Sequence, residues 1–429
     1  MEKSIFQIPV KTINRMKFYK KSQYWSAGKL SSYQDEQLNK LIIHAGNNVP
    51  YYRNLFKEIG FNPESFKSRE DLQKIPTLEK ETVRTRKDEF IADNAAKFGM
   101  TNDSTSGSTG TPLHFILSDG VQANKIAALL RSYNWAGYRI GQKTFSLQSY
   151  YFPESEFKYN RFYNILRFDS NKLQKRSALK VISEINRFKP KFFMGFPFDI
   201  LMLARFAREE GIEINSPQSI VTYGETLSDV KRKQLEFEFN CRVFNFYSLH
   251  ECSAMIAECE AGNLHLIDDF AYHEIIEEDG INRLVGTSYY NYSMPLIRYE
   301  IRDNVELCDT SELCECGRHF RRIKEIIGKE CDYIQTLDGR FLGAVMSHSI
   351  DNADGVICSQ CVQHSLDEVD INLITDSRFT SNSQQKLEKD LRKRLGTRMK
   401  LKFNIVNELE KRPGGKTPFI LSRIGNEYI

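Results

Sequence analysis

A run of hydroxyls and glycines between Thr105 and Pro112 carries the clearest chemical signal in this sequence. Gly107 and Gly110 have no Cβ atom to hold the backbone away from a phosphate, so backbone amides can approach its oxygens. Further hydroxyl donors surround these glycines, and they are Ser104, Thr105, Ser106, Ser108 and Thr109. The run is typical of a phosphate-binding loop, although the same composition also occurs in loops that bind nothing.

The loop does not end in the GK[ST] triplet of the Walker type. In that triplet the lysine reaches the terminal phosphates and the hydroxyl binds Mg²⁺. The sequence therefore disfavours a kinase-like or motor-like NTPase.

Three charged residues farther along the chain have side chains that ATP chemistry uses. Glu251 follows an aromatic stretch and offers a carboxylate to Mg²⁺. Asp303 can accept hydrogen bonds from two ribose hydroxyls, and Lys416 presents an ammonium group after two glycines. Each has a simpler interpretation when taken alone: Glu251 as a solvated side chain, Asp303 as an ion-pair partner of Arg298, and Lys416 as part of a turn.

The elements that must position these groups alternate between helical and strand patterns. Apolar runs at 191–195, 219–223 and 242–247 predict buried strands, and helical patterns at 118–138 and 173–188 lie between or before them. Further helical patterns cover 33–45, 51–59 and 69–84, with breaks near Pro50 and Pro76. This alternation predicts an α/β architecture for the large domain.

At 429 residues the chain exceeds the size at which one hydrophobic core stops growing, so two domains are expected. We place the first at 1–329 and the second at 330–429. The second is of mixed α+β type, with a hairpin turning at Asp338 and Gly339, a basic helix at 383–395 and a strand at 399–406.

The order of these segments resembles that of adenylate-forming ligases, and within them the phenylacetate-CoA ligase group with its capsular-polysaccharide-biosynthesis relatives. The resemblance covers nearly the whole chain and includes Gln37-Leu38, His44-Ala45, Asn48 to Arg53, Leu72 to Pro76, Gly195 to Pro197 and Tyr223 to Glu225. It implies a large N-terminal adenylation domain, with mixed sheets flanked by helices, and a small mobile α+β C-terminal lid domain that carries the catalytic lysine.

The resemblance also implies roles for individual residues. Glu251 would bind Mg²⁺, Asp303 would bind the ribose, and Lys416 would be the catalytic lysine. The remaining nucleotide-binding residues, around the phosphates and the adenine and at the hinge, would be Thr105, Ser106, Gly107, Ser108, Thr109, Gly110, Gly224, Glu225, Phe246, Tyr247, Ser248 and Lys329.

The implied activity is that of an AMP-forming ligase. A small carboxylic acid is activated with ATP to an acyl-adenylate, and the acyl group then passes to CoA or to an amine, such as an amino sugar in surface-polysaccharide assembly. At the hinge, where the family has Gly-Arg-x-Asp-Asp, this chain has Gly328-Lys-Glu-Cys-Asp332. This departure keeps open an alternative, a catalytically altered nucleotide-binding protein of the same fold.

His250 is a second departure, because the family has a small residue before the magnesium Glu. We count His250 among the candidate catalytic residues. It would line the acyl pocket or contact the adenylate, and a packing or solvated role is the alternative.

Cys259, His265, Cys314 and Cys316 form a Cys₃His set that suits tetrahedral zinc. With four protein ligands the site would be closed and structural, bracing the segment between Glu251 and the hinge. Free buried thiols are the alternative. Cys252 and Cys308 are the substitutes if one ligand is assigned wrongly.

Composition argues against several other classes of protein. The formal charge of +4 on so long a chain argues against a nucleic-acid partner, and the cysteines lack zinc-finger spacing. The start of the sequence has no signal-peptide pattern and no stretch is apolar enough for membrane insertion, so a cytoplasmic location is expected. Six aromatic residues would form either an acyl pocket or core, and they are Tyr150, Tyr151, Phe192, Phe193, Phe196 and Phe198.

Overall fold

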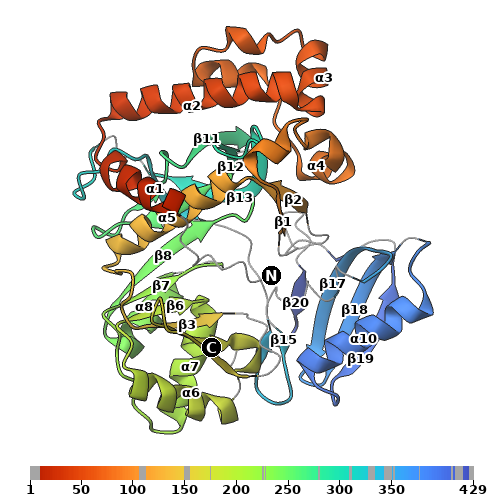
Figure 1. Ribbon diagram of the computed structural model, residues 1–429. Coiled ribbons are helices and arrows are strands. Elements are labelled where there is room, and N and C mark those ends of the chain that lie inside the picture. The colour runs from red at the N-terminus through yellow and green to blue at the C-terminus, as the bar shows by residue number, and fades with distance from the viewer. Residues whose placement is uncertain are drawn as a thin grey trace.

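A computed structural model describes residues 10–105, 113–148, 155–173, 175–224, 227, 229–278, 281–308, 312–326, 334–342, 350, 353–375, 377–406, 409–410 and 419–424. Within these ranges one large body and one small sheet domain lie side by side (Figure 1). The strand and helix alternation predicted from the sequence is confirmed, and the fold is of mixed α/β type.

The large body contains a twelve-stranded sheet with the order β11-β12-β13-β14-β10-β9-β8-β7-β6-β3-β5-β4. Its parallel half comprises β3 (Thr144–Gln148), β5 (Ile165–Asp169), β6 (Phe192–Gly195), β7 (Ser219–Thr222) and β8 (Arg242–Ser248). The strand β4 (Phe157–Asn160) closes one edge in antiparallel fashion.

The other half of this sheet is antiparallel, beginning where β9 pairs with β8. Its strands are β9 (Met255–Glu258), β10 (Leu264–Leu266), β11 (Ala271–Glu278), β12 (Ile281–Ser288), β13 (Tyr299–Leu307) and β14 (Arg322–Ile326). A separate hairpin of β1 (Thr101–Ser104) and β2 (His114–Leu117) flanks the loop that begins at Thr105.

Helices cover both faces of the parallel half, as buried parallel strands require. Neighbouring residues of β6 show the two faces: Phe192 packs in the core beside α5, whereas Phe193 packs in the core beneath α6, α7 and α8. The helices of the large body are α1 (Val10–Ser22), α2 (Ala27–Asn48), α3 (Pro50–Glu58), α4 (Lys80–Thr85), α5 (Asp119–Trp135), α6 (Lys175–Phe188), α7 (Pro197–Glu209) and α8 (Asp229–Phe239).

The segment predicted as helix at 69–84 is divided in the structure. A 3₁₀ helix at Arg69–Lys74 ends before Pro76, and α4 begins at Lys80. Proline has no backbone N–H to continue a helix, so the chain between them is extended. Short 3₁₀ helices also occur at Pro63–Ser65, Lys87–Phe90, Ala95–Phe98 and Ser170–Lys172.

The small domain has a four-stranded sheet of order β19-β18-β17-β20 with its own hydrophobic core. Leu387, Leu391 and Leu395 of one helix are buried in this core. Its elements are β17 (Val356–Ser365), β18 (Glu368–Thr375), α10 (Ser381–Leu395), β19 (Lys400–Ile405) and β20 (Ile420–Ser422). The predicted hairpin is present as β15 (Ile334–Gln335) and β16 (Phe341–Leu342), joined through a turn that includes Asp338 and Gly339.

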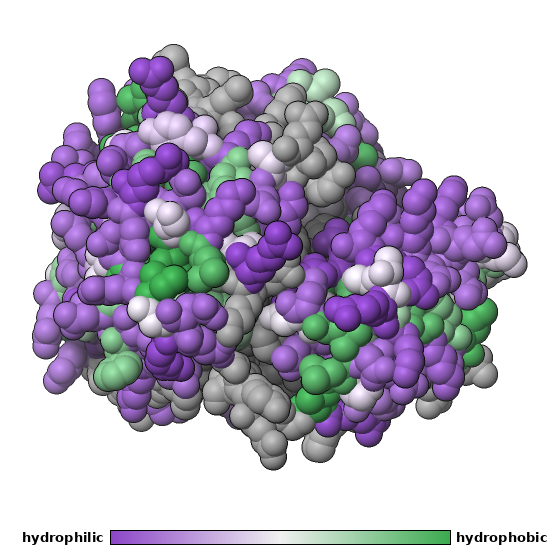
Figure 2. Space-filling view, turned by 90° about the horizontal axis from the view of Figure 1, so that it is seen from below, coloured by the Kyte–Doolittle hydropathy of each residue, from purple (hydrophilic) through white to green (hydrophobic). Residues whose placement is uncertain are grey.

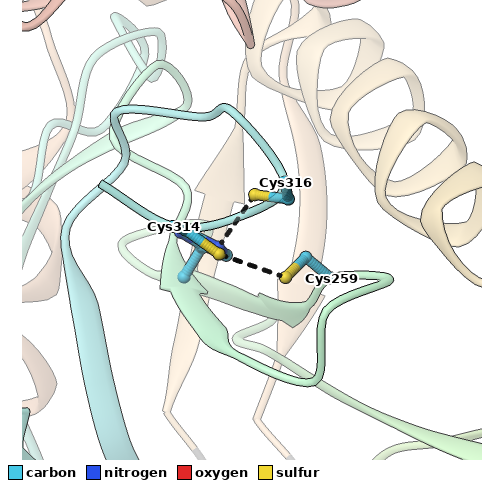
Figure 3. Close-up of side chains that lie close together, drawn as sticks. Cys259, Cys314 and Cys316 are labelled. Atoms are coloured by element: carbon cyan, nitrogen blue, oxygen red, sulfur yellow. Dashed lines mark hydrogen bonds between the residues drawn. The ribbon is translucent and has the colours of Figure 1, made fainter. Parts of the chain in front are cut away.

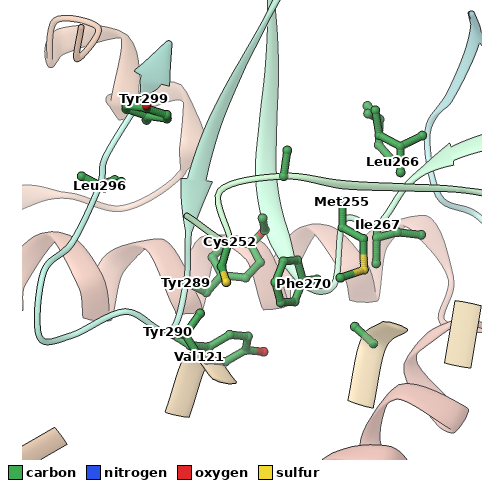
Figure 4. Packing of buried hydrophobic residues seen from close by; sticks show 14 of the residues in the cluster. Val121, Cys252, Met255, Leu266, Ile267, Phe270, Tyr289, Tyr290, Leu296 and Tyr299 are labelled. Atoms are coloured by element: carbon green, nitrogen blue, oxygen red, sulfur yellow. The ribbon is translucent and has the colours of Figure 1, made fainter. Parts of the chain in front are cut away.

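The main core of the large body lies where the antiparallel strands meet α5. Val121, Phe270 and Tyr290 pack together there with residues around Cys252 and Met255 (Figure 4). Hydrophilic residues cover most of the face shown in Figure 2, with hydrophobic side chains gathered in small patches. In the described part of the chain every helix is too short or too polar to span a lipid bilayer.

A buried ion pair lies beside this core. Arg131 of α5 makes two hydrogen bonds of 3.1 Å to Asp269, and both side chains are almost fully shielded, at 4% and 0% exposure. Ser22 at the end of α1 donates to the same carboxylate. The pair thus joins α1, α5 and the segment before β11.

We predict that Asp269→Ala lowers the free energy of unfolding by about 3–5 kcal/mol, because it leaves the Arg131 charge buried without its partner. The matched control is Glu278→Ala, which removes an acid from the exposed Arg283–Glu278 pair and should cost less than about 1 kcal/mol. Urea unfolding followed by circular dichroism measures both. Equal effects of the two substitutions would contradict a stabilising role for the buried pair.

Candidate functional site

The carboxyl ends of β6, β7 and β8 meet at one edge of the parallel sheet, where open α/β sheets bind their ligands. Gly224, just after β7, has a φ of +79°, and a Cβ there would lie 2.5 Å from the ring of Phe196. The backbone after β7 therefore lies so close to Phe196, just after β6, that only glycine fits at position 224.

Glu251 is positioned by a tight turn after β8. The N–H of Cys252 donates to the Leu249 carbonyl (3.2 Å), and the Leu249 N–H donates to the Ala254 carbonyl (3.3 Å). Cys252 adopts a φ of +61°, which is a strained conformation for a residue with a side chain. The turn buries Glu251 to 5% exposure, and its carboxylate accepts a hydrogen bond from the Tyr299 hydroxyl (3.2 Å).

The surroundings of Glu251 suit a bound cation. Among the described residues no lysine or arginine forms an ion pair with this carboxylate, and Tyr299 contributes a neutral hydroxyl. A buried carboxylate without a basic partner is costly, and an added divalent cation offsets that cost. These residues therefore fit the Mg²⁺ that the sequence predicts.

Asp303 on β13 accepts a hydrogen bond of 2.6 Å from the hydroxyl of Tyr247 on β8. Burial and the adjacent Asp303 carboxylate raise the pKa of Tyr247 well above its ordinary value, so the phenol remains a donor. The ion pair between Asp303 and Arg298 that the sequence left open is not formed. Arg298 pairs instead with Glu274 (3.0 Å) and also donates to the Ile75 carbonyl.

Thr105 closes the neck of the glycine-rich loop. Its N–H donates to the Leu113 carbonyl (3.0 Å), and its hydroxyl accepts from the Leu113 N–H (2.9 Å). Lys80 of α4 donates to the same hydroxyl at 3.4 Å. Sequence reasoning missed Lys80, since it lies 25 residues before Thr105 within a segment assigned only as helix.

Backbone hydrogen bonds connect the segment before Lys80 to the start of the strand that carries Tyr299 and Asp303. The Leu78 N–H donates to the Arg298 carbonyl (2.8 Å), and the Glu300 N–H donates to the Leu78 carbonyl (2.9 Å). The segment before Lys80 therefore runs along the start of β13, next to Tyr299. Thr105, Glu251 and Asp303 are thereby held on neighbouring segments of one region.

His250 lies beside this group. Its side chain is 59% exposed, and its Nδ1 atom is 3.8 Å from a carboxylate oxygen of Asp103 on β1. Burial raises the pKa of Asp103, but the interactions with His250, supplemented by the Ser104 N–H and Lys125, outweigh burial and leave that pKa below its ordinary value. Sequence reasoning did not single out Asp103 or Lys125.

The other predicted residues take different positions. Phe246 is buried against Tyr133 of α5, at 5.0 Å between ring centroids, whereas Ser248 ends β8 and is half-buried. Of the aromatic candidates, Phe192 and Phe193 are core residues, and Phe196 is half-buried near Tyr223. The predicted residues outside the described ranges are Ser106, Gly107, Ser108, Thr109, Gly110, Tyr150, Tyr151, Glu225, Lys329 and Lys416, and also the side chain of Phe198.

The Cys₃His set converges at a second place. The ligand atoms of Cys259, His265, Cys314 and Cys316 all lie within 4.8 Å of one another. The Sγ atoms of Cys259 and Cys314 are 3.8 Å apart, and Cys316 Sγ is 3.4 Å from His265 Nε2. Figure 3 shows the three cysteines pointing inward from two loops. The two substitutes, Cys252 and Cys308, are not members of this group.

The second ring nitrogen of His265 is also engaged. Its Nδ1 atom lies 3.1 Å from the Phe320 carbonyl, so Nδ1–H donates there and Nε2 faces the thiols with its lone pair. Interaction with Cys259 lowers the pKa of the Cys316 thiol, and His265 and Arg318 lower it further. A thiolate and a neutral imidazole are the ligand forms that zinc requires.

Arg318 connects this cluster to the N-terminal helices. Its side chain is 3% exposed, lies 4.3 Å above the Trp135 ring and donates to Glu260 (2.7 Å). It also donates to Gln23 (3.2 Å), whose side chain accepts from the Trp135 indole (2.8 Å). The cluster is therefore packed against the junction of α1 and α5.

Sequence comparisons identify relatives over most of the chain. Protein CapK of Staphylococcus aureus is 27% identical over 91% of this chain and 89% of its own length. A phenylacetate-coenzyme A ligase of Thermus thermophilus is 26% identical over 71% of this chain and 72% of its own. Residues 334–423 match the CapK C-terminal domain family.

A solved structure has the same fold. The 2-hydroxyisobutyryl-CoA ligase in complex with 2-HIB-AMP and CoA aligns with a TM-score of 0.64, covering 94% of this chain and 92% of that one. The two sequences are 18% identical, so this likeness bears on the fold alone. The resemblance first noted in the sequence is thus confirmed: this chain is a homologue of CapK and the phenylacetate-CoA ligases, and it has the fold of the adenylate-forming ligases.

Proposed function

We propose that this protein is an AMP-forming ligase that activates a small carboxylic acid with ATP and passes the acyl group to coenzyme A. The observation that carries the proposal is that Tyr247, near the end of β8, donates to Asp303 and Tyr299 donates to Glu251 just after β8, while Lys80 joins Thr105 to the same region. The name of one sequence relative, phenylacetate-coenzyme A ligase, agrees with it.

The first step needs positive charge and aligned donors, because a carboxylate attacks the α-phosphate of another anion. In our proposal the loop that begins at Thr105 and the Lys80 ammonium bind the phosphates, and Asp303 accepts hydrogen bonds from the ribose hydroxyls. Glu251 holds Mg²⁺, which neutralises phosphate charge when bound. Lys416 reaches the site from the domain that we place at 330–429, which serves as a lid over 1–329.

The second step transfers the acyl group from the adenylate to an acceptor. The sequence relative named phenylacetate-coenzyme A ligase supports a thiol acceptor. An amine, for example on an amino sugar used in surface-polysaccharide assembly, is the alternative acceptor, and the resemblance to CapK is what supports it.

We further propose that the Cys₃His cluster binds a structural Zn²⁺. Four protein ligands leave no open position for a substrate, so this site would stabilise the fold without taking part in the reaction. Two observations support the zinc proposal. The four ligand atoms lie close together, and the Phe320 carbonyl accepts a hydrogen bond from Nδ1 of His265.

ATP–pyrophosphate exchange with a panel of small carboxylic acids tests the proposed first step directly. Exchange that depends on one class of acid supports an AMP-forming ligase. ATP binding without exchange for any acid would instead favour the alternative, a catalytically altered nucleotide-binding protein of the same fold.

We predict that Lys416→Ala slows pyrophosphate exchange by about 10²–10³-fold, because in our proposal this lysine supplies positive charge to the reacting phosphate. Lys402→Ala is the control, since Lys402 is an exposed lysine of β19 in the same domain. It should exchange at nearly the wild-type rate. Wild-type exchange by Lys416→Ala would refute the role given to this lysine.

Protein purified without chelator should contain about one zinc per chain, as a closed four-ligand site requires. Cys314→Ser should lose most of this zinc, whereas Cys241→Ser, which changes a thiol outside the cluster, should keep it. Zinc removal should also alter the fluorescence of Trp135, whose ring centroid is 6.0 Å from that of His265. Elemental analysis showing only trace zinc in the wild-type protein would contradict the proposal.

A further inference from the structure

The Asp103–His250 pair lies next to the proposed phosphate site but has no role in the first step as described above. Asp103 and Thr105 are two residues apart at the end of β1, so their side chains project to the same side. His250 immediately precedes Glu251 in the turn after β8. The pair therefore joins the neck of the glycine-rich loop to the turn that carries the magnesium candidate.

The geometry of this pair places a carboxylate behind an exposed imidazole. Asp103 faces Nδ1 of His250, and a carboxylate in that place stabilises the ring once it is protonated. Lys125 of α5 also acts on Asp103, more weakly than His250 does. Glu251 is the neighbouring acid along the chain, and its carboxylate accepts a hydrogen bond from the Tyr299 hydroxyl.

Cys252 is the other reactive group of this turn, and it is unsuited to the same task. Its side chain is fully buried, and its thiol contacts the His250 carbonyl at 3.3 Å. The 59% exposed imidazole of His250 is the group that an incoming molecule can reach.

We propose that His250 is the general base of the acyl-transfer step, and that Asp103 is the residue that positions it. This inference rests on the proposed function. The acceptor class that follows is a nucleophile with a proton on its attacking atom, either a thiol or an amine.

In this step the acceptor sulfur or nitrogen forms a bond to the carbonyl carbon of the acyl-adenylate. The proton of the attacking atom moves to Nε2 of His250, while Asp103 stabilises the imidazolium through Nδ1. The bond between the carbonyl carbon and the phosphate oxygen then breaks, and AMP leaves with the electron pair. His250 returns its proton to solvent. The 3.8 Å separation from Asp103 agrees with catalytic contacts that shorten only when the substrate is bound.

The test separates the two half-reactions in the full-length protein. Pyrophosphate exchange with the best acid measures adenylation, and single-turnover transfer to coenzyme A or to D-glucosamine measures the second step. For His250→Ala, transfer should fall by about 100-fold, within the range of general-base catalysis, and at least about 30-fold more than exchange. Added imidazole should restore part of the transfer rate of His250→Ala. Asp103→Asn should reduce transfer by about 10-fold, and imidazole should not restore it.

The matched control is a second histidine–carboxylate pair on the small domain, His364 and Asp370, which are 3.5 Å apart. His364→Ala should behave like the wild type in both assays. His250→Asn keeps a polar side chain of similar size but cannot accept the proton, so it replaces His250→Ala if that variant fails to fold.

Three outcomes would overturn the inference. If His250→Ala lost exchange and transfer equally, His250 would be assigned to adenylate binding. If His250→Ala transferred the acyl group at the wild-type rate, His250 would have no role in this step. Exchange without transfer to either acceptor by the wild-type protein would also overturn it, although the proposed adenylation would stand. Absence of exchange in the wild type would instead count against the proposed function itself.

Discussion

Two backbone hydrogen bonds at Leu78 set the geometry on which the candidate site depends. They tie an extended segment of the N-terminal region to β13, 220 residues later in the chain, through Arg298 and Glu300. Lys80 follows directly and reaches Thr105 at the neck of the glycine-rich loop. Because backbone bonds do not depend on side-chain rotamers, this crossing fixes the segment before Lys80 relative to β13 before any ligand binds.

The two carboxylates of this region are held by tyrosines and not by arginine or lysine in the described part of the chain. Tyr247 donates to Asp303, and Tyr299 donates to Glu251. A neutral hydroxyl orients a carboxylate without cancelling its charge. The negative charge therefore remains available to a cation or to ribose hydroxyls, whereas an ion pair such as Arg298–Glu274 uses its charge within the fold.

The sequence predicts best those parts in which neighbouring residues determine the structure. Continuous apolar runs predicted β6, β7 and β8, and the close spacing of Cys314 and Cys316 predicted a cluster of thiols whose atoms do converge. The antiparallel strands β9 to β14 were not predicted: β9 and β10 have only four and three residues, and the longer β13 pairs with register shifts on both sides. Lys80 and Asp103 were missed for a related reason, because only the tertiary fold brings them beside Thr105 and His250.

The cysteine cluster lies where the antiparallel half has its shortest strand. The strand β10 has three residues. The loop between β13 and β14 is longer than β10 and also longer than β14. So short a strand forms few hydrogen bonds with its neighbours. Of the four cluster residues, Cys259 precedes β10 and His265 lies within it, whereas Cys314 and Cys316 lie in the loop between β13 and β14. A metal bound by all four ligands would cross-link these segments. The cross-link would hold β13, which carries Asp303, in place relative to β8, which carries Tyr247. The distance between the ribose candidate and its tyrosine would then depend on a site that takes no part in the chemistry.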